Sequence, residues 1–272
     1  MTGGAAWTWK ENGVAVVNLD DSYGQRLIDS QSNPCVSFGL QTGAQVTSKR
    51  FVGDLDGLDI AMHLEQAKLD FHVPFPGRFN LSNVLAASAA AHALSLPLEA
   101  IREGLEAVEP VPGRVERLDV AGPCPIYIDF AHTPGALSEL LALFQGTTRG
   151  RVILVFGCGG ERDKKKRPQM GQIAARGSEI PIVTSDNPRG ENPEAILVDI
   201  LGGLEAALAS GQTHYAIVDR KEAIQKAIQI ARQDDVLLIA GKGHEPYQIV
   251  GEERVPFYDG TIVQEILRTH GG

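Results

Sequence analysis

Three short polar segments of this chain place charged side chains beside glycine or proline, a combination that suits a small charged ligand. They are Gly157–Asp163, Asp186–Arg189 and Gly241–Glu245. Arg162 and Arg189 each offer a planar fork of donors that fits a carboxylate. Glu245 follows glycines that let a ligand ammonium group approach the backbone closely. If the fold brings the segments together, these side chains predict a site for an amino acid.

Simpler interpretations exist for the same residues. Residues 157–163 match an ordinary glycine-rich turn, and residues 186–189 match a turn with an acidic helix cap. The run Lys164–Arg167 is typical of a solvated basic surface, which we favour for Lys165 and Lys166. Two arginines at separate strand ends are harder to explain this way, so we favour function for them.

Two nucleotide-binding fingerprints are absent from these segments. Gly157, Gly159 and Gly160 do not have the G-x-G-x-x-G spacing of nicotinamide-dependent oxidoreductases. The lysine of Gly241–Glu245 is not followed by the Ser or Thr of a phosphate loop. A lone histidine is more often structural than catalytic, so we assign no role to His244.

A fourth polar segment, Asp129–Pro134, also follows an apolar run. Asp129 and His132 could serve base catalysis, but no serine or cysteine nucleophile accompanies them, and we predict no catalytic residue. A contact between Asp129 and a nucleotide ribose is the better functional interpretation. Thr133 before Pro134 is also expected to cap a helix.

The elements that carry these segments indicate an α/β fold with a doubly wound, mostly parallel sheet. Apolar strands are expected at 126–130, 152–156, 180–184, 215–218 and 236–240, with helices at 135–144, 167–176, 193–209 and 221–232 between them. In such sheets ligands bind beyond the carboxyl ends of the strands. All four polar segments follow a predicted strand.

The first part of the chain has a different pattern. We expect a strand at 14–19, antiparallel strands between residues 45 and 74, and helices at 80–96, with Asn80 as N-cap, and 98–108. The stretch Glu109–Gly113 is the best linker. We therefore predict domains at 1–110 and 111–272.

Composition excludes several classes of protein. The net charge is −9, which argues against a nucleic-acid or membrane-surface binder. No apolar run is long enough to span a bilayer, and residues 1–7 lack the features of a signal peptide. Cys35, Cys124 and Cys158 are far apart, without metal-ligand spacing, as expected for free thiols in the cytoplasm.

Together these motifs resemble the Mur ligase family over nearly the whole chain. Asn18–Asp21 looks like a late strand of the family's central domain. The segments Gly77–Asn83, Gly113–Arg114 and Asp129–Pro134 match further family motifs, with Phe130 in place of a tyrosine. The resemblance implies a Rossmann-like C-terminal domain preceded by part of the central domain. It also implies nucleotide contacts: Asn83 with adenine, Arg114 with the phosphates, Asp129 with the ribose, and His132 with the nucleotide in general.

Asp186–Arg189 resembles the motif of members that add meso-diaminopimelate. The resemblance implies that this amino acid binds to Arg162, Asp186, Asn187, Pro188, Arg189, Gly241 and Glu245. It further implies ATP, Mg²⁺ and UDP-N-acetylmuramoyl-L-Ala-D-Glu as reaction partners. Lysine lacks the distal carboxylate, and a site built around such a polar contact rejects the analogue by about 10⁴-fold or more.

One departure from the family is large. The chain has no G-x-x-x-x-G-K-[ST] loop, and the family's magnesium ligands and carbamylated lysine are also expected outside it. We therefore expect part of a ligase, inactive alone. The alternatives are a non-catalytic diaminopimelate-binding fragment and another amide ligase of the superfamily, such as a folylpolyglutamate or cyanophycin synthetase.

Overall fold

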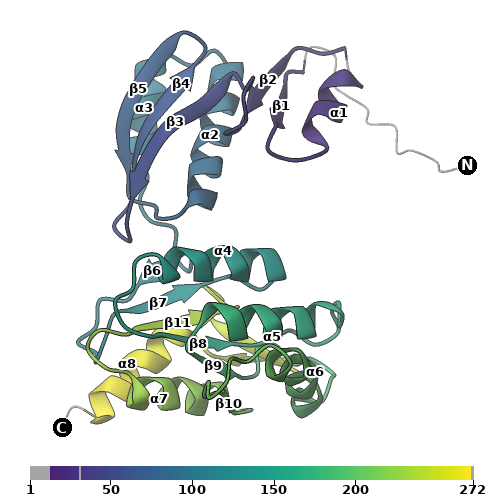
Figure 1. The fold of residues 1–272 in the computed structure, drawn as a ribbon, viewed down its shortest axis with the longest axis vertical. Helices are drawn as coiled ribbons and strands as arrows, with labels where there is room; N and C mark the ends of the chain where they lie inside the picture. Colours follow the sequence, from purple (N-terminus) through teal and green to yellow (C-terminus); the bar gives the residue numbers. More distant parts are fainter. Residues whose placement is uncertain (1–12, 31, 271–272) are drawn as a thin grey trace, which may run out of the picture. The chain divides into compact units, whose positions relative to one another are not determined.

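The computed structural model describes residues 13–30 and 32–270 and divides the chain into two compact units, Met1–Glu109 and Pro110–Gly272 (Figure 1). Each unit has its own sheet and is described separately. Within the described ranges, no helix combines the length and apolar character needed to cross a bilayer.

The first unit contains a five-stranded sheet in sequential order. Its elements are β1 (Ala15–Asn18), α1 (Gly24–Asp29), β2 (Cys35–Phe38), β3 (Val46–Gly53), β4 (Leu58–Leu64), β5 (Ala67–Val73), α2 (Arg78–Ala93) and α3 (Leu98–Glu106). Strands β1, β2 and β3 pair in parallel, and β3, β4 and β5 are antiparallel. In β4 every second side chain is buried, because one face of the sheet packs on α2 and α3.

The structure confirms the strand expected at 14–19 and the antiparallel strands between residues 45 and 74. The expected N-cap at Asn80 is wrong, because α2 already begins at Arg78, after Gly77 with φ of 92°. Asn80 lies inside the helix, and its Nδ2 donates to the carbonyl oxygen of Pro76.

The second unit contains a six-stranded sheet with helices on both faces (Figure 1). The strand order is β10-β9-β8-β11-β7-β6, with only β6 antiparallel to its neighbour. The strands are β6 (Glu116–Arg117), β7 (Ile126–Asp129), β8 (Val152–Phe156), β9 (Ile180–Val183), β10 (Tyr215–Ala216) and β11 (Val236–Ala240). The helices are α4 (Pro134–Gln145), α5 (Lys166–Gly177), α6 (Pro193–Glu205), α7 (Arg220–Ile230) and α8 (Asp259–His270).

Alternate residues of the buried strands face the two layers of helices. Ile126 of β7 packs into the cluster that contains α7 and α8. Its neighbour Tyr127 points to the other layer, where its ring makes an edge contact with Phe144 of α4. This arrangement confirms the expected doubly wound α/β fold.

The predicted strands and helices of this unit are present with small shifts of their ends. Three features were not predicted from the sequence: β6, the hairpin of β12 (Tyr247–Val250) and β13 (Glu253–Pro256), and α8. Strand β13 is exposed and β12 is mostly half-buried, and both lack the apolar pattern of the central strands.

Helices α5 and α6 pack closely through glycines. A Cβ atom on Gly203 of α6 would lie 2.0 Å from the carbonyl oxygen of Pro168, and one on Gly171 of α5 would lie 2.1 Å from that of Ile200. Both contacts involve backbone atoms, which cannot rotate away. The adjacent Gly202 is exposed, with no atom within 4 Å of its Cβ position.

We therefore expect opposite effects from substitutions at neighbouring glycines. Gly203→Ala should lower the free energy of unfolding by about 1–3 kcal/mol, because α5 and α6 must move apart. Gly202→Ala should raise it by about 0.5–1 kcal/mol through helix propensity. Denaturant unfolding of both variants measures the difference, and equal effects would contradict the close packing.

Candidate functional site

The three polar segments emerge side by side from one edge of the second sheet. In the register of the parallel strands, Val155 of β8 pairs with Ile182 of β9 on one side and with Ile239 of β11 on the other. The strands end in step, and residues 157–163, 186–189 and 241–245 follow them. The sheet therefore brings together the three segments that the sequence analysis selected for their charged residues.

Arg189 is anchored through both its backbone and its side chain. Its backbone has a left-handed φ of 51° and is bonded to the hairpin, with its N–H donating to Ile249 and its carbonyl accepting from Gly251. Its Nη1 donates to the carbonyl oxygens of Gly160 at 2.9 Å and Asn187 at 3.4 Å. Among the described residues, only this one guanidinium nitrogen has a protein partner, so the rest of the fork can bind a ligand.

Arg162 approaches the same place from the loop after β8. A Cβ atom on Gly159 would lie 2.9 Å from Nη1 of Arg189 and 3.8 Å from Cγ of Arg162. The absence of a side chain at Gly159 lets both arginines come close. Arg162 itself is exposed, so its head group can reach a ligand at the rim.

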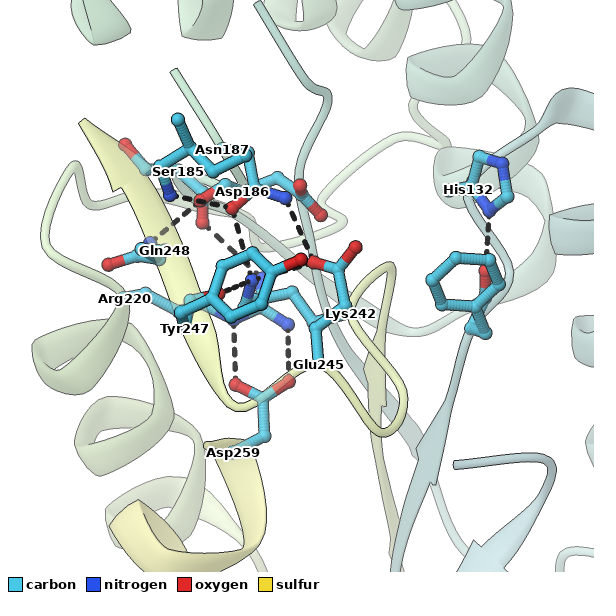
Figure 2. A network of polar contacts seen from close by, with 12 residues as sticks. His132, Ser185, Asp186, Asn187, Arg220, Lys242, Glu245, Tyr247, Gln248 and Asp259 are labelled. Carbon is cyan, nitrogen blue, oxygen red and sulfur yellow. Dashed lines mark hydrogen bonds and ion pairs between the residues drawn. The ribbon is translucent and has the colours of Figure 1, made fainter. Parts of the chain in front are cut away.

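The acidic side of the site is a buried network around Asn187 (Figure 2). Asn187 donates through Nδ2 to Oε2 of Glu245 at 2.9 Å and accepts through Oδ1 from the N–H of Ile249. The ammonium group of Lys242 lies 3.0 Å from the same Glu245 oxygen and 3.2 Å from Asn187 Oδ1. These contacts fix Glu245 from two sides.

Glu245 is kept ionised by its surroundings. Burial favours the neutral acid, but hydrogen bonds from Asn187 and Lys242, and the charges of Lys242 and Arg189, outweigh burial and hold the pKa of Glu245 below its usual range.

Asp186 has unused hydrogen-bonding capacity. Its side chain is buried, and Oδ2 has no hydrogen-bond partner among the described residues. A Cβ atom on Gly241 would lie 2.7 Å from this oxygen, and Gly241 has a φ of 113° that favours glycine. A buried carboxylate oxygen left unpaired is costly unless a ligand donor completes it.

A buried ion pair supports the residues that precede Asp186 and Gly241. Arg220 and Asp259 begin helices α7 and α8, and they form two contacts of 2.8 Å with both side chains fully buried (Figure 2). The same guanidinium donates to the carbonyl oxygens of Ser185 and Ala240. It therefore ties the ends of β9 and β11 to both helices.

A second network fixes the loop after β8. Glu191 accepts from buried Arg167 at 2.9 and 3.1 Å and from the backbone N–H of Glu161, and Lys164 lies 3.0 Å away. The hydrogen bonds from Arg167 are the main reason that the pKa of Glu191 falls to about 2. Lys166 is half-buried, and its ammonium group donates to the carbonyl oxygen of His132 at 2.7 Å at the surface.

The segment after β7 forms a separate cluster. Asp129 is buried, which raises its pKa, and its two oxygens accept from the N–H groups of Val115 at 2.8 Å and Ala131 at 2.6 Å. The guanidinium of Arg114 lies over the ring of Phe130 at 4.9 Å, and the ring of His132 makes an edge contact with the same ring. Asp129 thus positions the loop that carries Arg114.

Thr133 caps α4 by accepting from the N–H of Ala136, as predicted. In the first unit, Asn83 is exposed on α2, and its Nδ2 donates to the side chain of Asn80. The nucleotide-binding roles of Asn83, Arg114, Asp129 and His132 remain predictions. Within the described ranges, no group of three or more His, Cys, Asp or Glu side chains could hold a metal ion.

Several residues of the site were not predicted from the sequence. Lys242 was not selected because it lacks the context of a phosphate loop, although a lysine between two glycines after a buried strand was a signal. Arg220 and Asp259 are 39 positions apart, and no local pattern links them. Gln248, which donates to the carbonyl oxygen of Asp186, belongs to the hairpin that was not predicted.

Comparisons with known proteins match this chain to one family. Residues 113–243 match the model described as Mur ligase, glutamate ligase domain, and residues 8–91 match the Mur ligase middle domain. A relative from Geobacter metallireducens, named UDP-N-acetylmuramoyl-L-alanyl-D-glutamate--2,6-diaminopimelate ligase, is 43% identical over 97% of this chain and 54% of its own length. A Gloeobacter violaceus protein of the same name is 44% identical over 94% and 52%. The chain spans about half the length of these curated relatives.

Solved structures agree with the fold. A structure named for the same ligase is 33% identical, with a TM-score of 0.61, over 95% of this chain and 54% of its own. A folylpolyglutamate synthase from Mycobacterium tuberculosis has a TM-score of 0.68 at 19% identity, over 84% of this chain and 52% of its own. At that identity the second likeness concerns the fold alone.

The ion pair behind the site gives a stability prediction. Arg220→Met should lower the free energy of unfolding by about 3–5 kcal/mol, because Asp259 would remain buried without a partner. Lys221→Met, next to it but in an exposed pair with Glu265, should cost less than about 1 kcal/mol. Denaturant unfolding compares the two variants. A loss of unfolding free energy in Arg220→Met as small as that in Lys221→Met would show that the buried pair does not stabilise the fold.

Proposed function

This chain belongs to the Mur ligase family, and we propose from that premise that it carries the amino-acid acceptor site of a peptidoglycan ligase. Its ligand is meso-diaminopimelate, which the complete reaction joins to UDP-N-acetylmuramoyl-L-Ala-D-Glu. The proposal depends on one observation: among the described residues only Nη1 of the Arg189 guanidinium has protein partners, and the ionised carboxylate of Glu245 belongs to the same group of strand-end loops. The names of the curated relatives support the same reaction.

The charges of the site complement this ligand. Diaminopimelate has two ammonium and two carboxylate groups, so it needs cations and anions in one pocket. Arg189 and Arg162 can pair with a carboxylate, whereas Glu245 and the free oxygen of Asp186 can accept from an ammonium group. Asn187 and Gly241 set the spacing between these groups through the contacts described above, and Pro188 lies against the loop after β8, where a Cβ atom on Gly160 would be 1.9 Å from its carbonyl oxygen.

Binding by these groups orients the ligand for reaction. With one end of the molecule held by Arg189 and Glu245, the amine at the other end is presented in a restricted range of directions. ATP, when bound to the complete enzyme, activates the γ-carboxylate of D-Glu by phosphorylation. The residues of the acceptor site bind and orient the amino acid and take no part in that phosphorylation.

Nucleotide contacts form a second part of the proposal. Asn83 would contact adenine, Asp129 the ribose and Arg114 the phosphates, with His132 nearby. The two oxygens of Asp129 each keep a lone pair beyond their backbone contacts. ATP and Mg²⁺ also need a phosphate loop and metal ligands, and the 272 residues contain no such loop.

We assign residues 1–110 to the central domain of the family and 111–272 to its C-terminal domain. The two matched family models and the two compact units support this division. We place the protein in the cytoplasm, where a reducing environment keeps thiols such as Cys35, Cys124 and Cys158 free.

A second candidate function is a binding module without catalysis, favoured by the lack of a phosphate loop. A folylpolyglutamate or cyanophycin synthetase activity is the other alternative. Diaminopimelate binding is expected of the binding module and not of a folylpolyglutamate or cyanophycin synthetase. Ligase activity of the complete enzyme is expected from our proposal and not from a binding module.

We expect this chain to bind meso-diaminopimelate with clear preference over lysine, as measured by titration calorimetry. Arg189→Ala should weaken binding by at least about 30-fold, because a partly buried charge pair is lost. Arg176→Ala removes an exposed arginine from the last turn of α5 and should leave affinity unchanged. Equal binding of lysine, or an unaffected Arg189→Ala variant, would contradict the proposed ligand.

We expect no ATP-dependent tripeptide formation by this chain alone, because phosphoryl transfer depends on a phosphate and metal cradle. Chromatographic detection of the product tests this, with the ligase from Geobacter metallireducens as the positive control. Product above the no-enzyme background would show that these residues suffice for catalysis.

A further inference from the structure

Lys242 is a fully buried lysine at the centre of the proposed site (Figure 2). Its side chain has 0% exposure, which is rare for a lysine and costly without partners. None of the roles proposed above uses it. Its place in the fold follows from β11, which ends at Ala240 and delivers Lys242 between Gly241 and Gly243.

The ammonium group of Lys242 is saturated by protein acceptors. It donates to Oδ1 of Asn187, to Oε2 of Glu245 and to the backbone carbonyl of Tyr247. A lysine has three N–H donors, so none is left for a ligand. Lys242 is therefore not a ligand contact or a catalytic group.

These acceptors come from two parts of the chain, the loop after β9 and the connection from β11 into β12. Asn187 follows β9, Glu245 follows β11, and Tyr247 begins the hairpin strand β12. Asn187 and Glu245 also bond to each other at 2.9 Å. A single cation thus closes a ring of contacts around the two polar side chains that face the ligand.

We propose that Lys242 is a positioning residue that locks Asn187 and Glu245 into the arrangement that receives the ammonium group of the amino acid. The inference rests on the proposed acceptor site and adds a residue that determines its geometry. Without the Nζ contacts, the carboxylate of Glu245 would keep only Asn187 as a hydrogen-bond partner among the described residues and could turn away.

Charges on every neighbouring segment act on Glu245. Lys242 and Arg189 favour its ionised form, and Glu245 in turn acts on Arg220 of α7. Asp186 is the nearby acid after β9, and Asp259 of α8 is already neutralised by Arg220. Lys242 is the only one of these cations that donates directly to the Glu245 carboxylate in the described contacts.

The sign of the pH effect follows from this arrangement. Binding of an ammonium group needs ionised Glu245, so it is present above the pKa of Glu245 in the folded protein and is lost as pH falls through it. The pKa is lowered in the native protein, against the effect of burial. Without Lys242, the effect of burial is opposed by fewer contacts, so the pKa of Glu245 should rise. The pH below which binding is lost, the acid limit of binding, should therefore move to higher pH.

The variant to test is Lys242→Met in the full chain, which keeps an unbranched side chain of similar length. The matched control is Arg151→Met, which breaks the partly buried pair of Arg151 and Asp235. Arg151 directly precedes β8, at the end of the strand opposite the site. Both variants remove a cation and destabilise the fold, but only the first should change the site.

We expect Lys242→Met to bind meso-diaminopimelate at least about tenfold more weakly at pH 7 by calorimetry, with the acid limit of binding moved to higher pH. Arg151→Met should have the native affinity and pH profile at a similar loss of stability. Native binding and an unchanged profile in Lys242→Met would overturn the inference. A loss shared equally by both variants would also overturn it, since it would indicate a merely structural role.

A ligand-independent measurement separates this inference from the proposed function. Titration of the Glu245 carboxyl carbon by NMR, with the signal assigned through Glu245→Gln, should give a higher pKa in Lys242→Met than in the native chain. Absence of diaminopimelate binding by the native chain would count against the proposed function and leave this comparison intact. If Lys242→Met does not fold, the native titration decides, and a Glu245 pKa above the usual glutamate range contradicts the inference.

Discussion

The site depends on the compensation of buried carboxylates by buried cations. Asp186 and Asp259 are buried and Glu245 is half-buried, at the ends of two strands and the start of a helix. Lys242 and Arg220 lie among them, and each also donates to backbone carbonyls of the same loops. Charge balance and loop geometry are therefore set by the same two side chains, which is why polar groups can be concentrated in this part of the fold.

Close approach of backbone segments is the second requirement. Gly159 leaves room for two arginines, and Gly241 leaves room for the carboxylate of Asp186. A Cβ atom on Gly160 would lie 1.9 Å from the carbonyl oxygen of Pro188, so the loops after β8 and β9 are in contact there. Glycine at these places lets the loops that carry the cationic and anionic side chains pack against each other.

The alternation of strands and helices and the polar segments at the strand ends could be predicted from the sequence, because both follow from local patterns. Arg189 and Glu245 were recognisable since an arginine in a tight turn and an acid after glycines are unusual. The pair of Arg220 and Asp259 was not predictable, because each residue alone matches an ordinary helix start and their meeting depends on tertiary packing. Asn80 failed as a cap because Gly77, with its positive φ, started the helix earlier.

The hairpin β12–β13 holds the backbone of Arg189 through a parallel bridge to Val250, and its strands are half-buried in β12 and exposed in β13. The direction of the arginine is thus set by a surface ribbon that contributes no charged group to the pocket. Changes of sequence in this ribbon escape the constraints of a packed core, yet they act on the backbone of Arg189, the residue proposed to receive a carboxylate of the amino acid. Libraries aimed at new acceptor preferences can accordingly be built on the ribbon, leaving every contact residue as it is.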